Sequence, residues 1–199
     1  MSLPLALARI EQIEQAFVPQ QPVAASAAAP MAAAPVASAA MAPAAGPSFA
    51  SLLGNAGGSP MTTIAGAEVG QAEQPPGSND SPRIAQYRTA TAGSGVGPWC
   101  GYFVSWVARQ AGMPLGDHGE GFGSVDQLYA WAQRAGRAVP NGPGVVPRPG
   151  DLVVFHEHVG IVEQVLPDGR IQTIEGNYSD RVSRNVHDFS DALGYVRMS

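Results

Sequence analysis

The sequence contains a single cysteine among 199 residues, so no disulfide can form within the chain. Charged residues make up only 14% of the composition, and the net charge is −5. That balance lacks the clustered positive charge that nucleic acids and anionic membrane surfaces attract. No uninterrupted apolar run approaches the length of a transmembrane helix. We therefore expect no nucleic-acid partner and no transmembrane segment.

The start of the chain also lacks a secretory signal, because residues 1–17 have neither a basic beginning nor a cleavage site. Apolar residues recur there at gaps of three and four from Leu3 to Phe17. This spacing predicts a short amphipathic helix over residues 1–17. A helix of this length is barely stable alone. It is either a marginal element or a docking helix for a protein partner.

Composition divides the rest of the chain into two parts. Residues 18–61 are rich in alanine and proline, which predicts a disordered, extended linker, since proline interrupts helices and alanine buries little surface. Residues 62–199 have the patterns of a folded domain. Helices are expected first, over residues 62–72, 81–89, 98–110 and 124–135, with Ser81 and Ser124 as caps of the second and fourth. Strands follow over residues 151–155, 159–165, 170–174, 181–187 and 193–197, with a hairpin turn expected at residues 167–169. Helices followed by a mostly antiparallel sheet indicate an α+β fold.

The lone cysteine, Cys100, lies at the start of the third expected helix. A thiol attacks a carbonyl as the thiolate, and the first turn of a helix stabilises that anion through its dipole and free N–H groups. The same N–H groups can hold the oxyanion of a tetrahedral intermediate. Gly101 would let a substrate approach this backbone closely. The alternative is that Cys100 is a small core residue of the helix.

Two later strands carry candidate partners for a thiol. His158 begins one expected strand, and Glu175 and Asn177 lie two residues apart at the end of the next. Alternation in the first of these strands places residues 158, 160 and 162 on one face and residues 159 and 161 on the other, and the glycine at 160 leaves room for a neighbour of the His158 ring. Alternation along a strand places Glu175 and Asn177 on one face, about 6.5–7 Å apart. We expect Glu175 to orient His158, and Asn177 to position substrate or the oxyanion. The alternatives are an exposed carboxylate at a strand end and a turn asparagine.

A metal site is the competing chemistry, because His156 and His158 form a close pair. Zinc would need a third ligand, and His118 or His187 would have to come from distant parts of the sequence. We therefore expect no metal and no cofactor.

Together these segments resemble the cysteine, histidine-dependent amidohydrolase/peptidase (CHAP) family. The resemblance covers about residues 62–199 and is carried by residues 98–100, 103–106, 150–155, 158–162 and 174–177. It implies a papain-like α+β fold and cleavage of peptidoglycan stem or cross-bridge peptides. Cys100 would be the nucleophile, His158 the base, and Glu175 with Asn177 the orienting or oxyanion groups. Around the cysteine, the residues expected to bind substrate are Trp99, Gly101 and Trp106. Gly101 departs from the family pattern, where many members carry alanine.

The N-terminal residues 10–13 and 49–53 are similar to leaders on wall hydrolases of flagellar gene clusters. This similarity implies export through the flagellar apparatus, from the cytoplasm to the cell wall. Two other functions stay open. The domain could be a catalytically silent module for wall binding or assembly, or an amidase for a small soluble amide.

Overall fold

The computed structural model describes residues 58–198. The expectations for residues 1–17, and for the linker up to residue 57, lie outside the described residues. The described helices are α3 Pro60–Ala67, α4 Pro82–Arg88, α5 Cys100–Gln110, α6 Val125–Arg134 and the short 3-10 helix η1 Phe189–Asp191. The strands are β1 Ala138–Pro140, β2 Leu152–Phe155, β3 His158–Val165, β4 Ile171–Tyr178, β5 Arg181–His187 and β6 Gly194–Val196.

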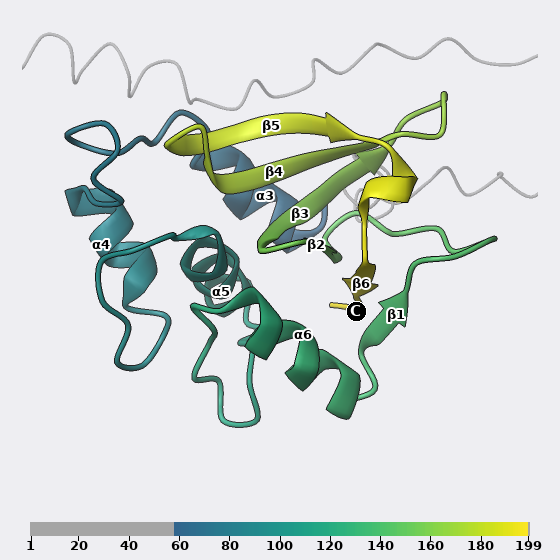
Figure 1. Ribbon diagram of the computed structural model, residues 1–199, viewed down its shortest axis with the longest axis horizontal. Coiled ribbons are helices and arrows are strands. Elements are labelled where there is room, and N and C mark those ends of the chain that lie inside the picture. The colour runs from purple at the N-terminus through teal and green to yellow at the C-terminus, as the bar shows by residue number, and fades with distance from the viewer. Residues whose placement is uncertain (1–57, 199) are drawn as a thin grey trace, which may run out of the picture. The chain divides into compact units, whose positions relative to one another are not determined.

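The strands form one antiparallel sheet in the order β1-β6-β2-β3-β4-β5 (Figure 1). The four α-helices described within residues 58–198 precede all six strands, so the predicted α+β class is confirmed. The expected hairpin between β3 and β4 is also present, with Gly169 at a φ of 88° and Leu166 N–H bonded to Arg170 O at 2.8 Å. Strand β1 was not predicted, because its three residues gain their strand character only from pairing with β6.

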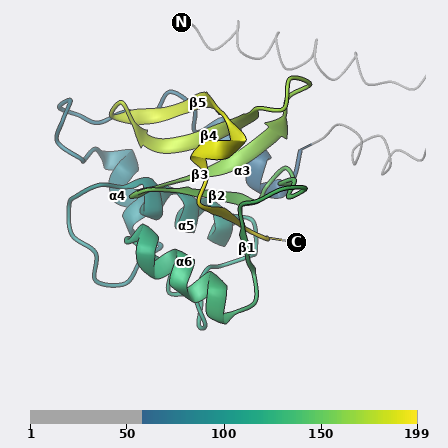
Figure 2. The same ribbon diagram turned by 45° about the vertical axis from the view of Figure 1, so that its right-hand side comes forward.

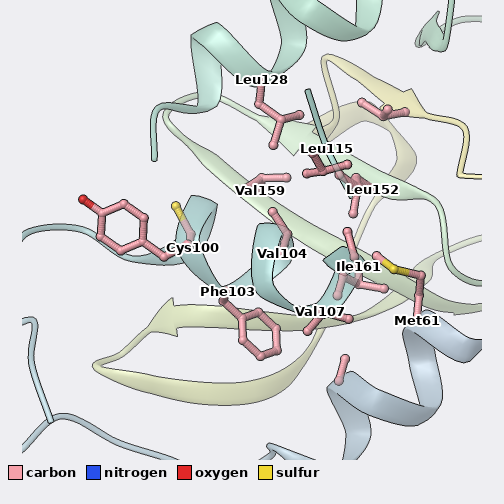
Figure 3. Packing of buried hydrophobic residues seen from close by; sticks show 14 of the residues in the cluster. Met61, Cys100, Phe103, Val104, Val107, Leu115, Leu128, Leu152, Val159 and Ile161 are labelled. Atoms are coloured by element: carbon pink, nitrogen blue, oxygen red, sulfur yellow. The ribbon is translucent and has the colours of Figure 1, made fainter. Parts of the chain in front are cut away.

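The helices cover one face of the sheet, with α5 in the middle of the packing (Figure 2). Phe103, Val104 and Val107 of α5 join Val159 and Ile161 of β3 in the main core (Figure 3). A smaller cluster lies on the opposite face, around Val153, Val162, Ile171, Ala192 and Tyr195. The alternation predicted for β3 is therefore confirmed up to Val162, where a bulge shifts the pairing with β4.

Two helices begin where the sequence places their caps. Ser81 Oγ accepts the N–H of Ile84 at 3.2 Å, and Ser124 Oγ accepts the N–H of Gln127 at 3.4 Å. Helix α5 instead begins at Cys100, two residues later than expected, with Trp99 as its N-cap. The difference moves the cysteine to the first position of the helix.

The first described helix, α3, begins at Pro60, two residues before the predicted start of the domain at residue 62. Ser59 caps α3 by accepting the N–H of Thr62 at 3.2 Å, and Met61 is fully buried in the core. The same helix ends at Ala67 instead of residue 72. Gly70 leaves the helical path with a φ of 98° and donates its N–H to Val182 O at 2.9 Å. Contact with β5 thus ends the helix.

Candidate active site

Cys100 occupies the first position of α5, at the edge of the packed core (Figure 3). The first backbone hydrogen bond of the helix joins Phe103 N–H to Trp99 O at 2.9 Å. The N–H groups of residues 100–102 precede that bond and have no partner inside the helix. The residue is only 3% exposed, yet it borders a cavity of about 410 Å³. The other lining residues are Pro98, Gly123, Ser124, Val125, Asp126 and Glu157.

His158 and Glu175 are directly bonded, as the sequence predicts. His158 Nε2 lies 2.8 Å from Glu175 Oε2, and the glutamate side chain has no exposed surface. Burial lowers the pKa of His158, but hydrogen bonding to Cys100 and Glu175 and their negative charges outweigh it, raising the pKa to about 9. Because Nε2 is committed to the glutamate, Nδ1 is the nitrogen left for the thiol.

The carboxylate of Glu175 keeps its charge in this buried position. Burial raises its pKa, but hydrogen bonds from His158 and Thr173, and the positive charges of His158 and His187, bring the pKa below its ordinary value. At neutral pH the site therefore holds an ionised carboxylate against an imidazolium.

Gly160 of β3 gives the Glu175 side chain its place. A Cβ at residue 160 would lie only 2.6 Å from Cγ of Glu175 and 3.3 Å from its Cδ. The glutamate side chain thus lies across the backbone of β3 where only glycine leaves room. The sequence pattern indicated space beside His158 at this glycine, and the structure shows that Glu175 fills it.

His187 is a site residue that the catalytic interpretation of the sequence missed. Its Nε2 lies 2.6 Å from Glu175 Oε1, so one carboxylate serves two imidazoles. His187 pairs with Ile171 across the sheet, whereas Glu175 pairs with Ser183. Register alone would therefore not bring the two side chains together. The signal in the sequence was the alternation of side chains along a strand. Glu175 lies on the same face of β4 as Ile171, and the side chain of His187, the partner of Ile171, points to that face as well.

Asn177 stands apart from this constellation. Its φ of 63° is left-handed, and the β4–β5 pairing is irregular between Glu175 and Tyr178. The alternation that put Asn177 on the face of Glu175 depends on a regular strand, so it does not extend to this residue. Its expected role in positioning substrate or the oxyanion stays a prediction.

Trp99 and Trp106, which the sequence predicts to bind substrate, are packed against other side chains of the domain. Trp99 is fully buried and donates its Nε1–H to Glu73 Oε1 at 2.9 Å. Trp106 packs with its ring centroid 5.2 Å from that of Tyr87, and the Arg83 guanidinium lies 4.8 Å above it. Within the described residues, neither tryptophan lines the cavity at Cys100. Both hold helices together.

Gly101 lies against the backbone of a neighbouring loop. A Cβ at this position would lie 2.7 Å from the carbonyl oxygens of both Phe122 and Gly123. The chain's own loop, and not a substrate, makes the close approach to Gly101. That loop continues into the cavity wall beside Cys100.

Residues 58–198 contain no group of three or more histidine, cysteine, aspartate or glutamate side chains placed to hold a metal ion. His158 and His187 both direct Nε2 at Glu175, while His118 and His156 are exposed in loops. In the same part of the chain, no helix is long and apolar enough to cross a bilayer.

The site combines a helix-borne cysteine, a strand-borne histidine and a buried carboxylate, which are the residue types that nucleophile–base chemistry uses. Residues 91–177 match the CHAP domain family. This match agrees with the resemblance seen in the sequence, and the matched segment contains Cys100, His158, Glu175 and Asn177.

The chain is also similar to a solved structure, the peptidoglycan hydrolase RipB from Mycobacterium tuberculosis. The TM-score is 0.41 and the sequence identity 20%, over 69% of this chain and 62% of that one. The chain therefore spans about three fifths of the length of that structure. No curated protein sequence matches the chain.

Proposed function

We propose that this domain hydrolyses amide bonds in peptidoglycan stem or cross-bridge peptides through a covalent thioester at Cys100. The observation that carries the proposal is the arrangement of His158. Its ring is bonded to the buried carboxylate of Glu175 and interacts with the thiol at the wall of a cavity. The CHAP match supports the reaction class, and the family resemblance of the motifs supports peptidoglycan as the substrate.

The proposed reaction begins with attack of the Cys100 thiolate on the substrate carbonyl carbon. The oxyanion that forms is held by N–H groups at the start of α5. Collapse breaks the C–N bond, and His158 donates its proton to the leaving amine. His158 then takes a proton from the water that attacks the thioester, and collapse releases the acid and the Cys100 thiolate beside the re-formed imidazolium. Glu175 stabilises the imidazolium whenever His158 carries its second proton, and Asn177 assists substrate or oxyanion positioning.

The decisive test is Cys100→Ala in the full chain, assayed by release of dye from labelled peptidoglycan sacculi. We expect the variant to unfold like the wild type and to lose dye release, because removing a nucleophile typically costs several orders of magnitude in rate. His118→Ala, an exposed histidine, serves as the matched control and should keep full activity. Iodoacetamide should inactivate the native protein by alkylating its one cysteine.

Undiminished dye release by Cys100→Ala would remove the proposal. If the wild type binds sacculi without releasing dye, and its thiol is alkylated no faster than a free cysteine, the domain is instead a catalytically silent wall-binding module. Mass spectrometry of fragments released from defined muropeptides identifies the bond that is cut, and turnover of small soluble amides alone would indicate the simpler amidase.

For the N-terminal region we propose a separate task, namely export of the chain and contact with a protein partner through residues 1–17. The proposal rests on the apolar spacing from Leu3 to Phe17 and on the resemblance to leaders of flagellar-cluster wall hydrolases. Deleting residues 1–57 should leave dye release intact and abolish extracytoplasmic accumulation. Secretion unchanged by the deletion would contradict the proposal.

A further inference from the structure

His187 belongs to no part of the proposed reaction, yet it holds the carboxylate on which that reaction depends. Glu175 Oε1 is bonded by His187 Nε2 at 2.6 Å, while Oε2 is bonded by His158 Nε2 at 2.8 Å. The hydroxyl of Thr173 also donates to Oε1. Each oxygen of one fully buried carboxylate thus has its own imidazole.

The proton positions follow from the charge on the carboxylate. An ionised carboxylate only accepts hydrogen bonds, so Nε2 carries a proton in both rings. In His158 this protonation leaves Nδ1 on the side of the thiol, where it can hold or release the proton that the reaction moves. His187 makes its bond to Glu175 through the Nε2 proton.

Aromatic packing restricts the orientation of both rings. The Phe155 ring centroid is 4.6 Å from that of His187 and 6.2 Å from that of His158. Tyr178 lies 6.2 Å from His158 and 6.3 Å from His187, with its ring edge-on to both imidazoles. The two histidines and the carboxylate therefore form one packed unit between two aromatic rings.

We propose that His187 is a positioning residue for the Cys100–His158 pair, which acts by holding Glu175 so that Oε2 meets His158. The effect of this positioning on catalysis rests on the proposed function. Without His187, Oε1 of Glu175 keeps only the hydrogen bond from the Thr173 hydroxyl, and the carboxylate can rotate away from His158. The imidazolium, and with it the thiolate, is then less well stabilised.

The test compares His187→Phe, which keeps a ring between Phe155 and Tyr178 but removes the donor, with His187→Gln, which retains an N–H donor. His118→Phe is the matched control at an exposed histidine. The full chain is used, and two rates are measured at pH 7. The first is alkylation of Cys100 by iodoacetamide, followed by mass spectrometry, and the second is dye release from labelled sacculi.

We expect His187→Phe to slow both rates roughly tenfold, because a hydrogen bond to a buried charge is lost. His187→Gln should restore both to within about threefold of the wild type. Loosening of the fold would speed alkylation of a buried thiol, so slower alkylation cannot come from a merely structural defect. His118→Phe should change neither rate.

Alkylation of His187→Phe at the wild-type rate or faster would overturn the inference, as would a His187→Gln variant as slow as His187→Phe. The result is distinguishable from failure of the proposed function. If Cys100→Ala still releases dye, that function fails, whereas the alkylation rates still decide whether His187 positions the Cys100–His158 pair.

Discussion

At the scale of single residues, the central feature is a carboxylate with no exposed surface that is bonded to two histidines and a threonine. Taking an ion out of water costs several kcal/mol unless hydrogen bonds and opposite charge compensate it. Glu175 meets this requirement with His158, His187 and Thr173 together. The functional chemistry and the stability of this part of the sheet therefore depend on the same contacts.

The raised pKa of His158 predicts how stability depends on pH. The folded pKa of about 9 lies above the ordinary 6.5, so the contribution of the imidazolium is complete below pH 6.5 and is lost as the pH rises through 9. The full difference corresponds to roughly 3 kcal/mol. We expect the free energy of unfolding of the wild type, relative to His158→Gln, to fall by this amount between pH 6 and pH 10. Urea unfolding across that range measures it, and a difference that stays constant would contradict the assignment.

Gly160→Ala should disrupt the site without touching a reacting group. The added Cβ would lie 2.6 Å from Cγ of Glu175, so the carboxylate must move away from His158. We expect dye release from sacculi to fall at least tenfold, since small misplacements of a catalytic group are costly, and the unfolding free energy to fall by about 1–3 kcal/mol.

Gly142→Ala is the control for this change, because a Cβ there has nothing within 4 Å. It should leave both quantities unchanged. A Gly160→Ala variant with wild-type turnover would show that Glu175 has more freedom than its packing indicates.

At the scale of elements, the start of α5 is set by the loop that precedes α6. The carbonyl oxygens of Phe122 and Gly123 approach Gly101 so closely that a side chain has no space. Glu73 fixes Trp99, the residue before Cys100. Glu73 Oε1 accepts the indole N–H of Trp99 at 2.9 Å, and Oε2 accepts the backbone N–H of Asn79 at 2.8 Å. The nucleophile is held between these two contacts.

Gly101→Ala tests that packing. Alanine favours a helix by about 1 kcal/mol over glycine, but the clash with backbone oxygens costs about 1–3 kcal/mol. We expect a net loss of unfolding free energy, together with slower dye release, because the displaced loop forms the cavity wall beside Cys100. Urea unfolding gives the first quantity, with Gly97→Ala, in open space, as the control. A more stable variant would show that the loop yields easily.

The alternation of side chains along the strands was the most reliable guide to which face of the sheet a residue occupies. It correctly separated Val159 and Ile161 from Val162 and indicated room at Gly160 for a neighbour of His158. It was less informative at Asn177, whose left-handed φ of 63° accompanies the irregular β4–β5 pairing between Glu175 and Tyr178. An isolated bulge leaves no periodic trace in a sequence, so only the folded chain reveals it.

At the scale of the whole molecule, the core found within residues 58–198 is built from residues on both sides of the sheet. Its first residue along the chain is Met61 of α3. We expect deletion of residues 1–57 to change the free energy of unfolding by no more than about 0.5 kcal/mol.

Deleting four residues more is the matched control. Loss of residues 1–61 removes the Ser59 cap and the buried Met61 side chain, which should cost roughly 2–5 kcal/mol. Chemical denaturation of the two deletion variants measures the contrast. Equal stability of both would place the domain boundary at residue 62, as the composition alone suggests.

The sequence by itself determined the α+β class, the helix caps at Ser81 and Ser124, the β3–β4 hairpin and the pairing of His158 with Glu175. These features depend on local chemistry and on the periodicity of side chains, which neighbouring residues record directly. Only the tertiary structure decided that Trp99 is core, that Gly101 faces a loop and that His187 shares the carboxylate. Each of these depends on which segment, distant in the sequence, packs against the residue in the folded chain. The local sequence pattern does not encode such contacts.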